Sequence, residues 1–118
     1  MAEVTVRRVR EVVGDRKHGP TFLVDRLWPR GVSKADLDVD AWVKDVAPST
    51  DLRKWFAHDP DKWEEFQRRY RAELDANAEA AEPLLAAAGH GPVTLLYDAH
   101  DEEHNQAVAL RGWLLDQL

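Results

Sequence analysis

The order of apolar and polar residues along the chain predicts three strands and several helices. Valines alternate with polar residues over positions 4–9, VTVRRV, as in a half-buried strand. Two short and mostly apolar runs, Thr21–Asp25 and Val93–Tyr97, have the composition of strands buried inside a sheet. The stretch EVVGDRKHGP between the first two strands combines glycines with a proline and is typical of a loop.

Helical spacing is clearest after Asp59-Pro60, a pair that suits the start of a helix. Apolar residues then recur every three or four positions, which predicts one amphipathic helix. These residues are Trp63, Phe66, Tyr70 and Leu74. Two short helices are predicted earlier in the chain, one that begins at Ser33 with Asp36 completing a capping box and one over Ala41–Val46. A third covers Leu52–Phe56 with Ser49 as its cap. After the amphipathic helix, one more covers Pro83–Ala88 with Gly89 just beyond its end, and the last runs from Glu103 to the C-terminus.

This order of elements predicts an α/β fold in a single domain, with a small, mainly parallel sheet flanked by helices. The long helical connection between Val24 and Val93 implies that the strands at its two ends are parallel neighbours. Ligands of such sheets bind beyond the carboxyl ends of the strands. A ligand site is therefore expected at residues 25–34 and 98–105, which directly follow the two buried strands.

Composition narrows the class of protein. The 118 residues suit one domain, and 44% of them are apolar, which is enough for a packed core. The absence of cysteine excludes disulfides, thiolate-bound zinc, iron–sulfur clusters and a cysteine nucleophile. No apolar run reaches the roughly 18 residues of a membrane-spanning helix, and the charged start MAEVTVRRVR is unlike a signal peptide. We expect a soluble, cytoplasmic protein without a membrane partner.

The net charge of −6 is unevenly distributed. Residues 1–34 carry eight basic and four acidic side chains, a balance of +4, whereas residues 35–118 carry eight basic and eighteen acidic ones, a balance of −10. A nucleic-acid-binding domain is usually basic throughout or along one face, so a nucleic-acid partner is not expected. The simple interpretation of this uneven charge is that the basic and acidic parts of the chain attract each other across the folded surface. The more specific interpretation is a local anion-binding site within residues 1–34.

The segment DRLWPRGVSK, residues 25–34, is the first candidate site. It follows a buried strand and combines a Pro/Gly turn with Arg26, Arg30 and Lys34. Arginine forks match phosphate and carboxylate groups, and Ser33 would open a helix whose free amides favour an anion. The alternative is that the aspartate of this segment pairs with an arginine while its tryptophan fills the core. The segment has no Walker or dinucleotide-binding fingerprint, and no cofactor is predicted.

Histidines supply two further candidates. His100 and His104, four residues apart among acidic residues, are a weak alternative as ligands of a divalent metal, because part of this segment is predicted to be loop. The segment is not HExxH, so zincin chemistry does not apply. His58 beside Asp59-Pro60 could act as a general base or simply lie at a surface turn. The chain has five tryptophans, and those on the helical stripe are expected to fill the core rather than stack on bases.

Three segments together resemble the YeaO-like branch of the domain-of-unknown-function 488 (DUF488) family. They are LVDRLWPRGVSK (23–34), WVKDVAPSTDLRKWFAHDPDKWEEFQRRYRAEL (42–74) and GPVTLLYDAHDEEHNQAVAL (91–110). The resemblance implies an α/β fold and a small cytoplasmic bacterial or archaeal protein, and it implies no particular activity. Related branches have a Cys-His-Arg-like segment after the last strand. This chain has no cysteine there, so thiol chemistry is not carried over.

The resemblance also bears on single residues. His104 and Asn105 belong to the pattern of this branch, whereas His100 departs from it, which weakens the metal hypothesis. The preferred hypothesis is a pocket in which Arg26, Arg30, Ser33, Lys34 and Asn105 bind a small phosphate- or carboxylate-bearing ligand. Asp25 or His104 would be the acid or base of any reaction. The alternative is a non-catalytic interaction or regulatory protein, a homodimer through its tryptophan-rich helices.

Overall fold

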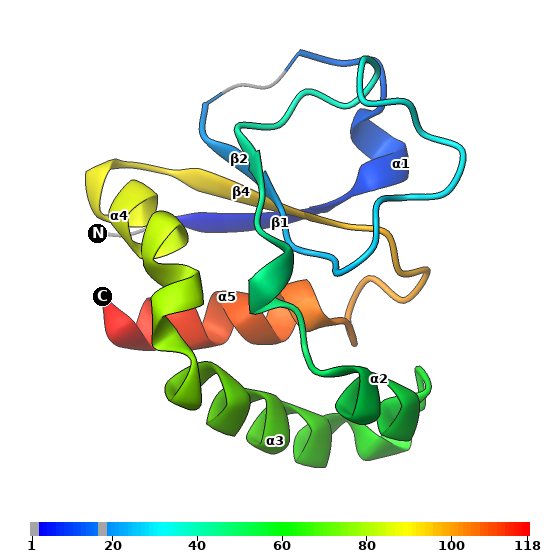
Figure 1. Cartoon of the computed structure of the whole chain (residues 1–118), viewed down its shortest axis with the longest axis vertical. Helices are drawn as coiled ribbons and strands as arrows, with labels where there is room; N and C mark the ends of the chain where they lie inside the picture. Colours follow the sequence, from blue (N-terminus) through cyan, green and yellow to red (C-terminus); the bar gives the residue numbers. More distant parts are fainter. Residues whose placement is uncertain (1–2, 17–18) are drawn as a thin grey trace.

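A computed structural model describes residues 3–16 and 19–118 and shows an α/β architecture (Figure 1). Four parallel strands form one sheet in the order β1-β4-β2-β3. The strands are β1 (Val4–Arg8), β2 (Thr21–Leu23), β3 (Ala41–Trp42) and β4 (Val93–Tyr97). The inner strand β4 pairs with two neighbours, so that Leu95 lies opposite Val6 on one side and Phe22 on the other. The predicted α/β class and the predicted parallel pairing of β2 with β4 are confirmed.

Helices lie on both faces of the sheet. In Figure 1, α3 and α5 lie below the sheet and the short α1 lies above it. The helices are α1 (Val9–Val12), α2 (Thr50–Phe56), α3 (Trp63–Ala76), α4 (Glu82–His90) and α5 (Gln106–Gln117), and short 3₁₀ turns cover Lys44–Val46, Pro60–Lys62 and Ala78–Ala81. No helix in the described part of the chain is long and apolar enough to cross a membrane.

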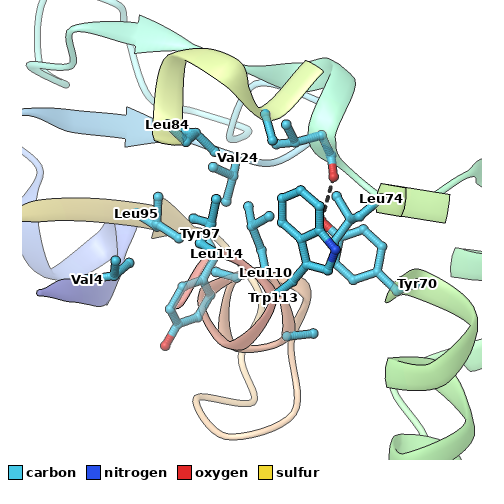
Figure 2. Close-up of a cluster of buried hydrophobic side chains, with 14 of the residues drawn as sticks. Val4, Val24, Tyr70, Leu74, Leu84, Leu95, Tyr97, Leu110, Trp113 and Leu114 are labelled. Carbon is cyan, nitrogen blue, oxygen red and sulfur yellow. Dashed lines mark hydrogen bonds between the residues drawn. The ribbon is translucent and has the colours of Figure 1, made fainter. Parts of the chain in front are cut away.

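The main core lies between the sheet and the helices α3, α4 and α5 (Figure 2). Alternate residues of β4, Leu95 and Tyr97, face this core because side chains of a strand point to opposite sides in turn. Their buried partners from the helices include Tyr70, Leu74, Leu84, Leu110, Trp113 and Leu114. The polar atoms brought into this core are satisfied: the Tyr70 hydroxyl donates to the Val46 carbonyl oxygen at 2.5 Å, and the Trp113 indole donates to Asp75 at 2.9 Å.

A smaller cluster covers the opposite face of the sheet with little helix. Val9, Leu23, Leu37 and Leu96 are its fully buried members. Trp28 and Trp42 pack against this cluster, and their two rings meet edge to face with ring centres 5.6 Å apart. The Trp28 indole donates to the Val32 carbonyl oxygen at 2.6 Å, and the Trp42 indole donates to the Asp25 carbonyl oxygen at 2.7 Å. Both tryptophans therefore fix the loop that follows β2, where the sequence places the candidate site.

The prediction of a helix at Ser33 is wrong, and of the helix predicted over Ala41–Val46 only the 3₁₀ turn Lys44–Val46 forms. Residues 33–40 form turns and bends, and the Ser33 hydroxyl oxygen accepts one bond from the Asp36 amide at 3.2 Å. The amide of Asp40 donates to the Thr21 carbonyl oxygen at 2.8 Å, which draws the chain alongside β2. Ala41 and Trp42 consequently form strand β3 instead of a helix.

The remaining predictions differ at the ends of elements. The helix α2 with its cap Ser49 and the amphipathic α3 are confirmed. The helix α4 continues through Gly89 to His90, and α5 begins at Gln106, after the segment expected to open it. The helix α1 lies in a stretch expected to be loop.

Candidate functional site

A cavity of about 590 Å³ opens at the carboxyl ends of β2 and β4. Its walls come from residues 25–30 after β2, residues 98–101 after β4, the start of α5, and α2 with the segments that flank it. This is the edge of a parallel sheet at which ligands bind in α/β proteins. The charged and amide side chains that line it include Asp25, Arg26, Arg30, Arg53, Asp98 and Gln106.

The Asp25 carboxylate joins the ends of the two inner strands. One of its oxygens accepts the backbone amide of Asp98 at 2.9 Å, and the other accepts the side-chain amide of Gln106. Burial raises the pKa of Asp25 to about 7, and the neighbouring charge of Asp98 also raises it, whereas the two hydrogen bonds and Arg53 lower it. This carboxyl group therefore exchanges a proton with solvent near neutral pH.

Arg26 connects the loop after β2 to the segment before α2. Its Nη2 donates to the carbonyl oxygens of Ala47 and Pro48 at 3.2 and 3.3 Å. Its Nε is buried and has no hydrogen-bond partner among the described residues. A buried N–H donor without a partner costs free energy, so this guanidinium retains an unused donor that is closed to solvent.

Arg30 and Arg53 are the exposed cations of the cavity. Neither guanidinium makes a hydrogen bond or an ion pair with any residue in the described ranges 3–16 and 19–118. The main chain at Arg30 is nevertheless fixed, because Arg10 donates to the Arg30 carbonyl oxygen at 2.9 Å. Both side chains are therefore free to meet a ligand.

The other acidic groups of the cavity already have partners. Asp98 accepts from Nε and Nη2 of Arg10 at 3.0 and 3.3 Å. Asp101 accepts the backbone amides of Glu103 and His104 at 2.9 Å, and these bonds lower its pKa. The His104 Nδ1 lies 2.9 Å from the same carboxylate. The charged side chains of the cavity that lack a partner among the described residues are consequently those of Arg30 and Arg53.

The histidines occupy different surroundings. His100 lines the cavity, and its Nδ1 lies 3.1 Å from Nη2 of Arg8. His104 packs its ring against the edge of Trp63, with ring centres 5.3 Å apart. His58 is exposed at the cavity with a positive φ of 57°. Among the residues that the structure describes, no three histidine or acidic side chains are grouped as a metal site would need.

The structure brings together only part of the predicted site. Asp25, Arg26 and Arg30 line one cavity, together with His100. The described residues around it do not include Ser33, Lys34, His104 or Asn105.

The residues outside the cavity have other contacts. Lys34 lies over the Trp28 ring at 5.9 Å and borders a separate cavity beside Asp36. Asn105 is only 1% exposed, and its side chain accepts the Val108 amide at 3.1 Å and donates to the Asp101 carbonyl oxygen at 2.9 Å. Asn105 thus caps α5.

Two residues of the cavity have no signal in the sequence. Arg53 lies on α2, 28 positions after Asp25, and lines the cavity only through the tertiary packing of the chain. Gln106 is the first residue of α5, and its contact with Asp25 spans 81 positions. Neither spacing matches a known short motif, so only the fold identifies these two side chains.

Comparison with known proteins gives relatives along almost the whole chain. A family described as the inactive DUF488-N3 subclade matches residues 3–118. The chain is 41% identical over 100 residues to the uncharacterized protein YeaO of Escherichia coli, which covers 85% of this chain and 87% of that protein. It is 46% identical over 91 residues to the uncharacterized proteins Mb3100c of Mycobacterium bovis and Rv3073c of Mycobacterium tuberculosis, covering 77% of this chain and 75% of each. No solved structure matches.

Proposed function

Because the chain belongs to the DUF488 family, within a subclade described as inactive, we propose that it binds a ligand without transforming it. The proposed ligand is a small molecule that bears a phosphate or carboxylate group and lies at the carboxyl ends of β2 and β4. The observation that carries this proposal is the unequal pairing of charges in the cavity. Asp98 and Asp101 are paired within the chain, whereas the side chains of Arg30 and Arg53 make no hydrogen bond or ion pair with a described residue.

The geometry of arginine suits this ligand class. A guanidinium offers several N–H donors in a rigid fork, which matches two oxygens of a phosphate or carboxylate. Two such forks come from different elements, the loop after β2 and the helix α2, so an anion between them would be held from two sides.

The test is anion-dependent thermal stabilisation. We expect inorganic phosphate, at constant ionic strength, to raise the Tm of the wild-type protein and to raise it much less in Arg30→Ala and Arg53→Ala. Lys54→Ala is the matched control, because it removes the same charge from an exposed position of α2 next to Arg53. The absence of phosphate-dependent stabilisation, or equal stabilisation of Arg30→Ala, would contradict the proposal.

A second candidate is proton transfer, and the pKa of Asp25 near 7 favours it. A group that titrates near the working pH is well suited to act as acid or base. Of the two residues that the sequence suggests for this role, Asp25 lines the cavity, whereas Nδ1 of His104 is engaged by Asp101. Asp25 is therefore the residue to examine if a reaction is found, and Asp25→Asn would abolish it.

Dimerisation through the tryptophan-bearing helices has less support. The Trp63 ring packs beside the stacked pair Phe56 and Phe66, with ring centres 5.9 and 5.7 Å away, and Trp55 carries Lys62 and Arg69 over its ring. Both indoles are thus engaged inside one chain. Light scattering at micromolar concentration checks this, since a stable dimer would favour an interaction protein instead.

A further inference from the structure

The cavity is much larger than the anionic group proposed to enter it. Its volume of about 590 Å³ lies in the range that holds a whole organic ligand, roughly 300–1,000 Å³. A phosphate group between Arg30 and Arg53 would leave much of this space to the remainder of the ligand. The walls around the remaining space therefore carry information about the ligand.

Apolar residues form part of those walls, beside the charged and amide side chains named above. Leu27 and Pro29 come from the loop after β2, Ala47 and Pro48 come from the segment before α2, and Ala99 follows β4. Leu27 is 65% exposed, which makes it the most exposed large hydrophobic side chain in the described part of the chain. Exposed aliphatic surface beside a cavity favours contact with an apolar group, because that contact removes both from water.

The exposure of Leu27 is imposed by its neighbours. Arg26 on one side is bonded to the carbonyl oxygens of Ala47 and Pro48. Trp28 on the other side is packed in the second cluster and bonded to the Val32 carbonyl oxygen. With both neighbours fixed, the Leu27 side chain is held outside the core at the cavity.

We propose that the ligand is amphiphilic, with one phosphate or carboxylate group and an apolar body of about one aromatic ring that contacts the exposed Leu27 side chain. This inference rests on the proposed function, and it adds that the apolar wall contributes to affinity and selects among anions. Arg30 and Arg53 bind the charged end, so the two parts of the ligand depend on different side chains.

The test compares inorganic phosphate with phenyl phosphate by isothermal titration. We expect phenyl phosphate to bind the wild-type protein at least about fivefold more tightly, since contact with a leucine side chain buries a few tens of Å² of apolar surface. Leu27→Ser should remove this advantage and leave the affinity for inorganic phosphate unchanged. Leu118→Ser, at a leucine that is 50% exposed elsewhere, should leave both affinities unchanged.

The outcomes separate the two proposals. Equal affinity for the two probes, with phosphate binding still lost in Arg30→Ala, would overturn the amphiphilic ligand and keep the anion site. Failure of both probes to bind would overturn the anion site as well. A lipid phosphate has the same chemistry, so sedimentation with phosphatidic acid vesicles is the second arm. We expect that the protein does not sediment with these vesicles. If it sediments with them and Leu27→Ser prevents this, the ligand is a lipid instead of a soluble molecule.

Discussion

Asp25 shows how a single carboxyl group can connect the sheet to the walls of the cavity. Its two oxygens bond to groups from β4 and α5, and its surroundings disfavour the charged form. A carboxyl group that is buried in this way is neutral more often than an exposed one at the same pH. The charge of the cavity therefore depends on pH in the neutral range.

The raised pKa of Asp25 predicts a dependence of stability on pH. The unfolded chain loses this proton near pH 3.8 and the folded chain near pH 7, so the folded state holds more protons between these values. The free energy of unfolding should therefore fall as pH rises from 4 to 7 and level off above about pH 8, with a loss of about 2.5 kcal/mol from this group between pH 5 and 8.

Urea unfolding of the wild type and Asp25→Asn at pH 5 and 8 measures this effect. The asparagine cannot ionise, and Gln106 can turn its amide to keep a hydrogen bond with it. The loss of unfolding free energy on going from pH 5 to pH 8 should therefore be smaller in Asp25→Asn than in the wild type, by the amount given above for this carboxyl group. Asp51→Asn, at an exposed position, should behave like the wild type. Parallel pH profiles of Asp25→Asn and the wild type would refute a pKa near 7.

At the scale of single residues, the sequence identifies the cavity residues that follow a strand end and misses those contributed by the helices. Asp25, Arg26 and Arg30 follow β2 directly, and a parallel sheet places such residues at its ligand edge. Arg53 and Gln106 arrive through tertiary packing, which local spacing does not encode. His104 was expected in the same pocket, but its pairing with Asp101 and its packing on Trp63 engage it beside that pocket.

At the scale of elements, the start of α5 is fixed by a buried cap. The Asn105 side chain accepts the amide of Val108, which caps the N-terminus of α5. It also donates to the carbonyl oxygen of Asp101, which fixes the turn that precedes the helix. This connection positions Gln106 against Asp25. The residue expected to bind a ligand instead holds the helix that forms one wall of the site.

Replacing this cap should therefore destabilise the protein. We expect Asn105→Ala to lower the free energy of unfolding by about 1–3 kcal/mol, because it removes a helix cap and leaves buried backbone groups without partners. Asn105→Ser keeps the acceptor for Val108 and should lose less. Asn77→Ala, at the exposed C-cap of α3, serves as the comparison and should lose less, because the Asn77 side chain makes only a long hydrogen bond of 3.5 Å to the Asp45 carbonyl oxygen. Chemical unfolding measures all three, and equal stability of Asn105→Ala and the wild type would argue against the cap.

The sequence predicts long elements better than short ones. The stripe of α3 recurs over several turns, so its period is clear, and the Ser49 cap also acts as expected. The segment from Ser33 to Val46 has capping residues and scattered apolar side chains that fit a short helix equally well. Its conformation is decided by pairing with β2 and by the burial of Leu37, which are contacts with distant parts of the chain.

At the scale of the whole molecule, β4 is the element on which the others depend. Leu95 is fully buried in the main core, and its strand separates β1 from β2. We expect Leu95→Ala to lower the free energy of unfolding by about 3–5 kcal/mol, since it leaves a cavity in a packed core. Leu27→Ala, at the exposed leucine, should change it by less than about 0.5 kcal/mol. Comparable losses in the two variants would contradict this arrangement of the core.

The α/β class follows from the sequence because long connections between buried strands require parallel pairing. The neighbour of β1 does not follow, since Val4–Arg8 could pair with either buried strand. In the structure, β1 pairs with Val93–Tyr97 of β4 and forms an edge strand of the sheet. This choice depends on how α5 covers both strands, including the bond from Arg111 to the Val4 carbonyl oxygen.

The position of β4 in the sheet has a consequence for synthesis on the ribosome. The strands β1 and β2 are made early, yet each lies beside β4, which comes after residue 92. Most of the sheet therefore cannot assemble while the first three quarters of the chain emerge, and the apolar faces of α3 and α4 have no sheet to cover until then. Folding should be a late and concerted event, in which pairing between distant segments sets the rate. A nascent chain stalled before Val93 should remain open to proteases and chaperones, whereas one extended past α5 should become protected.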